Sequence, residues 1–335
     1  MRIAVVLALG ALVLLGAQVD STCQLSGREL AAAPLHPASD GVTFQKGDGR
    51  VDVMIDGKPF TTYYHASDLP RPFFHPLRSA GGRVITRGFP MIKDVPAEAK
   101  DRDHPHHRSF WFTHGDVDGV DYWGENAKVQ GRIVNRSVDS MKPGKRGVLE
   151  VTRDWIDNNG KKVLVEKEQL TFSGDASRRL IDVRIDLTPV DHDVVFRDTK
   201  EGSFSIRLAT PLKEQNGSGV ITNSRGAVSE KSCWGKPAEW VDYSGTLEGE
   251  KLGVAIFDHP SSFRHPTTWH VRAYGLFAAN PFGLRDFTGD KSKDGSYKLE
   301  MGKHLVLSYR VLIHPGDAAT ANIAEEYKTY LRDVK

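Results

Sequence analysis

Cysteine and net charge are both scarce in this sequence. Only 2 of its 335 residues are Cys, which argues against a disulfide scaffold. The 45 Lys and Arg residues are balanced by 43 Asp and Glu residues, leaving a net charge of +2. Such a balance provides no extended field for nucleic acid or an anionic membrane surface. We therefore expect a small or neutral ligand and no nucleic-acid partner.

Long apolar runs are confined to the start of the chain. A short basic beginning is followed by an apolar stretch over residues 3–19 and then by polar residues. This pattern is typical of a secretory signal peptide and is short for a membrane span. We expect residues 1–22 to be a signal peptide, the protein to be exported to the periplasm or the cell exterior, and no integral membrane domain to follow. The polar residues before Cys23 disfavour a lipid anchor there.

Short motifs for nucleotide binding and for nucleophilic catalysis are missing. The sequence has no G-x-G-x-x-G or Walker pattern, and Gly81-Gly82 does not join a strand to a helix. It also has no G-x-S-x-G sequence, and the two Cys have no evident partnership. We expect no nucleotide cofactor, whereas a divalent metal stays possible.

What the chain does have is an all-β rhythm of short alternating runs. The clearest hairpin joins Val51–Ile55 to Phe60–Tyr64 through Asp56-Gly57, because those two residues tolerate positive φ. Further strands are predicted at Val148–Ile156, Lys162–Phe172, Leu180–Leu187, Ser203–Ala209, Leu252–Phe257, Thr268–Ala273 and His304–Ile313.

Helical periodicity occurs only at the C-terminal end. Asp317 can cap a segment that carries Ile323, Tyr327 and Leu331, and this helix should pack on the outside. No linker or repeat divides the rest of the chain. We expect a flexible segment over residues 23–48, followed by a single large two-sheet β-sandwich over residues 49–335.

The densest polar cluster runs from Asp103 to Asp116 and continues to Trp123. If residues 109–113 form a strand, Arg108 and His114 share one face with two Phe, while His107 lies on the other. We expect His106 and His114 to converge. Imidazoles suit proton transfer or metal binding. His106, His114 and Asp116 are the candidate metal ligands, although their spacing matches no established motif.

A second cluster repeats this chemistry in the C-terminal third. Two His-Pro pairs place His259 and His265 on extended or turn backbone, and Arg264 and Arg272 add forks for anions or hydroxyls. Between the clusters, Glu201 is a candidate general base whose charge Lys200 or Arg207 would balance. Trp234 and Trp240 lie among charged residues, as is common where sugar rings stack.

Several runs resemble a bacterial domain family of unknown function that is often labelled methane oxygenase PmoA. They are the runs Phe89 to Asp94, Asp103 to Val117, Lys200 to Gly202, Asn223 to Gly226, His265 to His270 and Asn280 to Gly283. The resemblance spans nearly all of the chain after the signal peptide. It implies an exported protein associated with carbohydrate breakdown, and the β-rich pattern is similar to the large sandwiches of the galactose mutarotase type. Methane oxygenase subunits of this name are integral membrane proteins, so the label itself implies no function here.

The leading hypothesis is an exported carbohydrate-active enzyme that uses His and Glu acid–base chemistry, as a lyase, an epimerase or a hydrolase. The candidate catalytic residues are His106, His107, His114, Glu201 and His259. The candidate substrate-binding residues are Arg108, Asp116, Trp123, Trp240, Arg264, His265, His270, Arg272 and Asn280.

Two alternatives stay open. The first is a non-catalytic glycan-binding module that stacks sugar on Trp234, Trp240 and Trp269. The second is a metal-dependent oxidoreductase. In the leading hypothesis the two clusters, around residues 106–116 and 259–272, should meet in one pocket, because a polyhydroxylated ligand needs several convergent donors.

Overall fold

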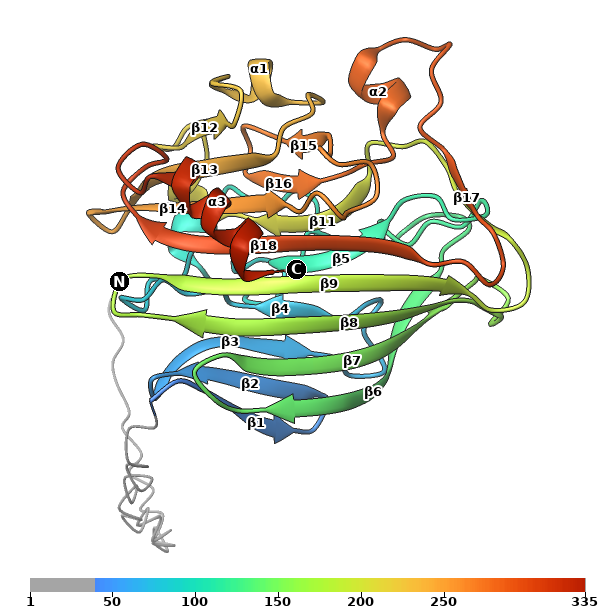
Figure 1. Ribbon diagram of the computed structural model, residues 1–335, viewed down its shortest axis with the longest axis horizontal. Helices are drawn as coiled ribbons and strands as arrows, with labels where there is room; N and C mark the ends of the chain where they lie inside the picture. The colour runs from blue at the N-terminus through green and yellow to red at the C-terminus, as the bar shows by residue number, and fades with distance from the viewer. Residues whose placement is uncertain (1–39, 335) are drawn as a thin grey trace, which may run out of the picture. The chain divides into compact units, whose positions relative to one another are not determined.

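Two large antiparallel sheets and a helix near the C-terminus make up the described part of the chain (Figure 1). The computed structural model describes residues 40–334. The predicted signal peptide, Cys23 and the first part of the predicted flexible segment lie outside the described residues. Across residues 40–334 no helix has the length and apolar character needed to cross a membrane.

Strands dominate the chain from residue 42 onward, and short helices interrupt them only in the second half. The strands are β1 (Val42–Gly47), β2 (Arg50–Ile55), β3 (Lys58–Tyr64), β4 (Phe73–His75), β5 (Phe110–His114), β6 (Arg132–Lys142), β7 (Gly147–Ile156), β8 (Lys162–Gly174), β9 (Arg179–Pro189), β10 (Val194–Phe196), β11 (Gly202–Arg207), β12 (Val220–Asn223), β13 (Trp240–Leu247), β14 (Glu250–Asp258), β15 (Trp269–Val271), β16 (Leu276–Ala279), β17 (Tyr297–Leu299) and β18 (Leu305–Pro315). The helices are α1 (Glu230–Cys233), α2 (Leu284–Thr288) and α3 (Ile323–Asp333), with short 3₁₀ turns η1 (Pro96–Glu98) and η2 (Thr210–Leu212).

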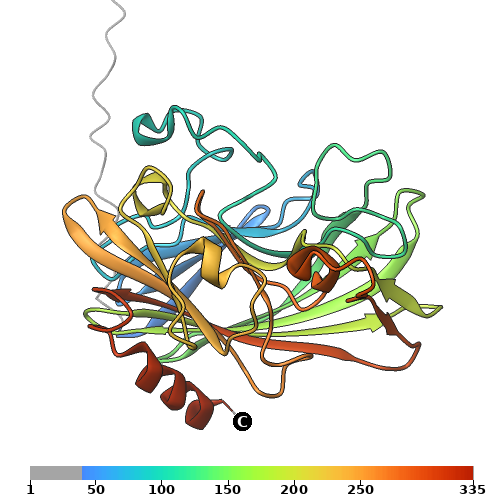
Figure 2. The same ribbon diagram turned by 90° about the horizontal axis from the view of Figure 1, so that it is seen from above.

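The strands form a two-layered sandwich, as predicted. The first sheet has the order β1-β2-β3-β4-β5-β11-β16-β15, and the second has the order β12-β13-β14-β18-β9-β8-β7-β6. The main apolar core lies between them, and Figure 2 shows the two layers from above. Strand alternation sends Phe110 and Phe112 into this core and Trp111 to the opposite, outer side of the first sheet. The same alternation along β11 points Arg207 outward.

The predicted hairpin is confirmed. β2 and β3 pair in antiparallel register, and φ is +51° at Asp56 and +72° at Gly57. Positive φ at both central residues is the requirement of a type I′ turn, which matches the twist of the flanking strands. The predicted strands in the second sheet also form, with β7, β8 and β9 paired in sequence.

The boundary predicted at residue 49 needs a correction. Residues 42–47, placed in the flexible segment, form β1 and pair with β2, with Val42 opposite Ile55. Val42 is 1% exposed and belongs to the main core. The sandwich therefore begins before residue 49. The strand is short and half polar, so its place is decided by pairing with β2 and not by its own pattern.

The C-terminal helix forms, but its cap differs from the prediction. α3 begins after Asn322, whereas the carboxylate of Asp317 accepts a hydrogen bond from the backbone N–H of Thr320, at 2.9 Å, in the preceding turn. Ile323 and Tyr330 of α3 are buried against apolar residues of β14 and β18. The helix covers the outer side of the second sheet (Figure 2).

A buried ionic network lies within the sandwich. Arg153 donates from Nη1 to Glu166 at 2.7 Å, from Nη2 to Glu168, and from Nε to the hydroxyl of Tyr63 at 3.0 Å. Trp155 donates to the second oxygen of Glu166 at 2.7 Å. One guanidinium thus faces two carboxylates. Burial raises the pKa of Glu168 to about 7. The positive charge of Arg153 lowers this pKa and the negative charge of Glu166 raises it, but the effect of burial is the largest.

This raised pKa predicts how stability depends on pH. Between the ordinary pKa of 4.5 and about 7, folded Glu168 holds a proton that the unfolded chain has lost. Its contribution is therefore fully present below 4.5 and is lost as pH rises through about 7. We expect Glu168→Gln to flatten the fall in the free energy of unfolding between about pH 5 and about pH 7.5, measured by urea denaturation. Exposed Glu300→Gln is the control, and an equal fall in all three proteins would contradict the prediction.

Candidate functional site

The outer side of the first sheet gathers aromatic, imidazole and guanidinium groups around β5 and β11. We call it the histidine face, which is defined by His104, His106, His107, Trp111, Trp123, Arg207, His270, Arg272 and Tyr274. A small apolar cluster that includes Trp111 and Trp123 forms its floor. The loop before β5 supplies the first three His, and the segment from β15 to β16 supplies Tyr274.

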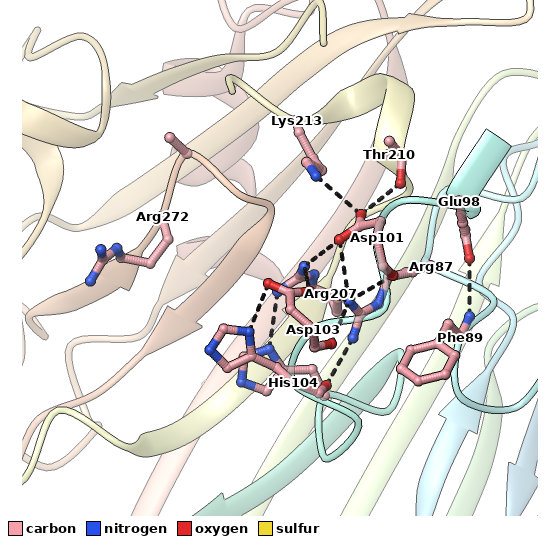
Figure 3. A network of polar contacts seen from close by, with 12 residues as sticks. Arg87, Phe89, Glu98, Asp101, Asp103, His104, Arg207, Thr210, Lys213 and Arg272 are labelled. Carbon is pink, nitrogen blue, oxygen red and sulfur yellow. Dashed lines mark hydrogen bonds and ion pairs between the residues drawn. The ribbon is translucent and has the colours of Figure 1, made fainter. Parts of the chain in front are cut away.

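A buried ionic network anchors the loop that carries these His residues (Figure 3). Arg87 and Arg207 are both 0% exposed, and their guanidinium groups donate to the same oxygen of Asp103, at 2.7 and 2.8 Å. Arg207 also donates to Asp101 at 3.0 Å, and Arg87 donates to the carbonyl of His104 at 2.9 Å. Removing a guanidinium from water is costly without such partners. The loop is therefore fixed to β11 by charge.

Asp103 and His104 form an oriented acid–base pair at the open edge of this network. The other oxygen of Asp103 lies 2.8 Å from Nδ1 of His104. Because a carboxylate only accepts, Nδ1 carries the proton and donates, which leaves Nε2 as the acceptor. The His104 side chain is 40% exposed, and its φ is +45°. Burial raises the pKa of Asp103, but the hydrogen bond from His104 and the charges of Arg207 and Arg87 outweigh it and lower that pKa below its ordinary value.

His107 lies beneath His104 and differs from it chemically. Its ring is 1% exposed and stacks on the His104 ring, with centroids 4.8 Å apart and planes 8° apart. Its Nδ1 lies 3.2 Å from Nη1 of Arg207. Since a guanidinium only donates, Nδ1 is the acceptor and the ring is neutral. Burial, then the charges of His106 and Arg207, lower the pKa of His107 well below 6.5. His107 is therefore a poor base.

Tyr274 joins the second sequence cluster to the first. Its ring lies parallel to that of His104, with centroids 5.1 Å apart and planes 3° apart. The guanidinium carbon of Arg207 lies 4.7 Å from the Tyr274 ring centroid, and that of Arg272 lies 5.4 Å from it. In Figure 3, Arg272 extends from the segment after β15 and lies across from the network. The end of the second cluster thus meets the first.

His270 and Glu201 lie within electrostatic reach of this junction. Burial, followed by the positive charges of Arg272 and Lys200, lowers the pKa of His270 to about 3. The charge of Glu201 is one of the factors that raise the pKa of Tyr274. Glu201 itself is half-buried and pairs with Lys200 at 3.4 Å. Arg207, which was expected to balance Glu201, binds Asp101 and Asp103 instead.

Two more predicted residues lie on or beside the histidine face. Trp123 is 3% exposed and packs on His107, with ring centroids 5.5 Å apart. Arg108 makes a bidentate pair with Glu125, at 2.7 and 2.8 Å, and lies over the ring of Phe73. Both side chains are already engaged within the protein, so they support the surface from below.

The expected convergence of His106 and His114 is wrong. His114 ends β5 on the face toward the main core, packs on Phe196 and Phe282, and has Nε2 at 2.8 Å from the carbonyl of Arg197. His106 lies on the outer side, T-shaped against His107. Strand alternation separates them, because His114 shares the core side of β5 with Phe110 and Phe112, whereas the loop that carries His106 packs on the outer side.

The candidate metal site is therefore not assembled. Asp116 pairs with Arg197 at 3.6 Å and accepts a hydrogen bond from the N–H of Gly119 at 2.8 Å. Within residues 40–334, His106, His114 and Asp116 do not come together, and no other group of three or more His, Cys, Asp or Glu is arranged to hold a metal ion. The metal-dependent alternative loses its predicted ligand set.

Most of the second cluster lies away from the histidine face. His259 contacts Val334 and Tyr330 beside α3. His265 donates from Nδ1 to Asp258 of the second sheet, at 2.8 Å. Arg264 donates to the carbonyls of Pro281 and Ser296, at 3.0 Å each. The predicted single pocket joining all of residues 106–116 and 259–272 is therefore not formed, and only the segment from His270 onward reaches the site.

Asn280 is occupied in contacts within the fold, and so are two of the three Trp residues expected to stack on sugar. The side chain of Asn280 donates to the carbonyls of Thr199 and Lys200, at 3.0 Å each, and so fixes the loop before β11. Trp240 packs with the apolar cluster under α3, and Trp269 is 0% exposed in the main core. Trp234 alone is near the site, with Arg272 over its ring at 5.8 Å. The glycan-binding alternative therefore lacks its three-Trp stacking surface.

Sequence reasoning missed the residues that organise the site. Asp103 and His104 lie inside the polar cluster but have no predicted role, and Arg87, Asp101 and Tyr274 are not among the candidates. One signal is present in the sequence, since an Asp directly before a His allows a local carboxylate–imidazole bond. The role of Arg87 has no local signal, because its partners lie 14 to 17 positions away along the chain.

The burial of His106 predicts an unusual titration. Burial, followed by the charges of Arg71 and His104, lowers its pKa to about 4. The hydrogen bond from His192 to Asp191 raises the pKa of surface His192 above 6.5. We expect the imidazole NMR signals to show His106 titrating near pH 4 and His192 above pH 6.5, with His106→Gln and His192→Gln used for assignment. Titration of His106 at 6.5 or above would contradict this environment.

Comparisons with known proteins give a family and a set of solved structures, two of which follow. The galactosidase domain of alpha-galactosidase-sucrose kinase, AgaSK, is 10% identical with a TM-score of 0.41, over 82% of this chain and 42% of that chain. A galactose mutarotase related enzyme from Lactobacillus acidophilus is 10% identical with a TM-score of 0.28, over 82% and 97% of the two chains. No curated protein matches the sequence. The methane oxygenase label has no support in these matches. Residues 50–328 match the profile of a family of unknown function, DUF6807, and the chain belongs to that family.

Proposed function

We propose that this protein is an exported carbohydrate-active enzyme whose active site is the histidine face. The observation that carries the proposal is the Asp103–His104 pair, an exposed imidazole held through Nδ1 by a carboxylate that two buried guanidinium groups clamp. This arrangement fixes the tautomer and aims Nε2 outward. It meets the geometric requirement for a general base or acid.

The network explains why His104, and not its neighbours, takes this role. Asp103 stays ionised because the hydrogen bond from His104 and the charges of Arg207 and Arg87 hold its pKa low, so it can stabilise the imidazolium that forms when His104 accepts a proton. His106 and His107 have pKa values lowered by burial, so they stay neutral and are weak bases. The buried ring of His107 instead holds His104 in place by stacking, and the half-buried ring of His106 packs on it edge-on.

The surroundings of His104 support a saccharide substrate. Half-buried Tyr274 stacks beside it and half-buried Arg272 lies over the Tyr274 ring, which combines an aromatic edge with charged donors. The charges of Lys200 and Glu201 act on the neighbouring His270 and Tyr274. Sugar hydroxyls both donate and accept, so they need such a mixed set. The proposal of export rests on the apolar stretch over residues 3–19 and on the polar residues that follow it.

The direct test compares the His104→Gln variant with a variant of a second Asp–His pair on the surface. His104→Gln keeps a hydrogen-bonding side chain but cannot exchange a proton, so we expect turnover to fall by about 10²–10⁴-fold. Wild-type protein is first screened against neutral, acidic and oxidised saccharides by chromatography of the products. His192→Gln is the control. His192 also forms a hydrogen bond with the preceding Asp, Asp191, at 2.6 Å and is 40% exposed, but its other ring nitrogen contacts Asp118, outside the histidine face.

The outcomes separate the alternatives. Loss of turnover in His104→Gln with retention in His192→Gln supports the proposal. Equal activity in the two variants would remove His104 from the mechanism. Binding of saccharides by wild-type protein without turnover of any of them would show a glycan-binding module instead.

A further inference from the structure

Tyr274 has no structural partner for its hydroxyl within the described residues, although its ring is held from several sides. His104 stacks parallel to the ring, while the guanidinium groups of Arg207 and Arg272 lie over it at 4.7 and 5.4 Å from the centroid. The hydroxyl makes no hydrogen bond to any side chain or backbone group within residues 40–334. Burial raises the pKa of Tyr274 to about 12, although the positive charges of Arg272 and Arg207 lower it, so the phenol stays protonated.

Arg272 provides a guanidinium beside this phenol. Its Nε lies 2.8 Å from Glu230, and that carboxylate also accepts the N–H of Ala273 at 2.5 Å, which holds Glu230 in position. The terminal nitrogens of Arg272 have no hydrogen-bond partner within residues 40–334, and the side chain is 30% exposed. A guanidinium oriented in this way is suited to bind a carboxylate by two parallel hydrogen bonds.

The arrangement of the two rings restricts the chemistry. The rings of His104 and Tyr274 are adjacent and parallel, with centroids 5.1 Å apart, so an imidazole and a phenol are close enough to reach one ligand together. Glycoside hydrolysis needs two groups that flank the bond from opposite sides. Adjacent groups instead suit removal of a proton and protonation of a leaving oxygen on one face of the sugar.

Resting on the proposed function, we propose that Tyr274 is the second catalytic residue and that the site carries out β-elimination on a saccharide bearing a carboxylate. Nε2 of His104 takes the proton from the carbon next to the carboxylate. The electron pair of that C–H bond forms a C=C bond with the neighbouring ring carbon, whose bond to the glycosidic oxygen breaks. The oxygen leaves with the proton of Tyr274, and solvent then returns a proton to Tyr274 and takes one from His104. No oxidant or water molecule is consumed.

Arg272 has a defined role in this step. A histidine can remove a proton from carbon only if the charge left on that carbon is stabilised by a neighbouring group. A carboxylate bound to Arg272 would delocalise the charge. The same saccharide with its carboxylate reduced to an alcohol should therefore not react.

The test uses hexuronate oligosaccharides and their carboxyl-reduced counterparts, with two readouts. Ultraviolet absorbance reports the conjugated unsaturated product, and NMR in deuterated water reports exchange of the C–H next to the carboxylate. We expect Tyr274→Phe to lose about 10²–10⁴-fold in elimination while it retains exchange, because only the leaving-group acid is missing. His104→Gln should lose both. Tyr297→Phe, a half-buried tyrosine on β17 that packs on Phe263, is the matched control.

The outcomes distinguish this inference from the proposed function. Full elimination by Tyr274→Phe would overturn the role of Tyr274. Hydrolysis or isomerisation by wild-type protein, with no unsaturated product from any hexuronate, would overturn the elimination chemistry and leave the proposed function standing. No conversion of any saccharide would overturn both.

Discussion

The site depends on two buried guanidinium groups that must be neutralised. Arg87 and Arg207 are fully covered, and each would be costly to bury alone, so the loop carrying Asp101 and Asp103 has to fold against them. Lys213 and Thr210 hold the other oxygen of Asp101, at 3.1 and 2.6 Å. This pairing fixes a loop without secondary structure of its own. The orientation of His104 follows from it.

The second constraint is the alternation of side chains across the first sheet. It sends the two Phe of β5 into the core between the sheets and Trp111 to the outer side, where it supports His107. Alternation along β11 and β15 brings Arg207 and His270 to that same outer side. The core and the candidate site are thus the two faces of one set of strands, and the packing that stabilises one face makes the other rigid.

The two buried ionic networks of this molecule differ in whether they reach the surface. Arg153 lies with Glu166 and Glu168 within the sandwich, where all three side chains are nearly inaccessible to solvent. The network of Arg87 and Arg207 reaches the surface through Asp103, whose side chain is 43% exposed. Only the second can pass the effect of its charges to an exposed group, His104, which is the proposed catalytic residue.

The local features could be predicted from the sequence alone. The Asp56-Gly57 turn, the long strands of the second sheet and the C-terminal helix follow from short-range pattern and backbone chemistry, and the loop from Asp103 to His107 stood out by composition. Only the folded arrangement shows which of those polar residues lie together. It separated His114 from His106 by alternation, drew His259 and His265 to other partners, and brought Tyr274 beside His104 across more than half the chain. Such pairings depend on strand order and register, because residues distant in sequence become neighbours only when the sheet has formed.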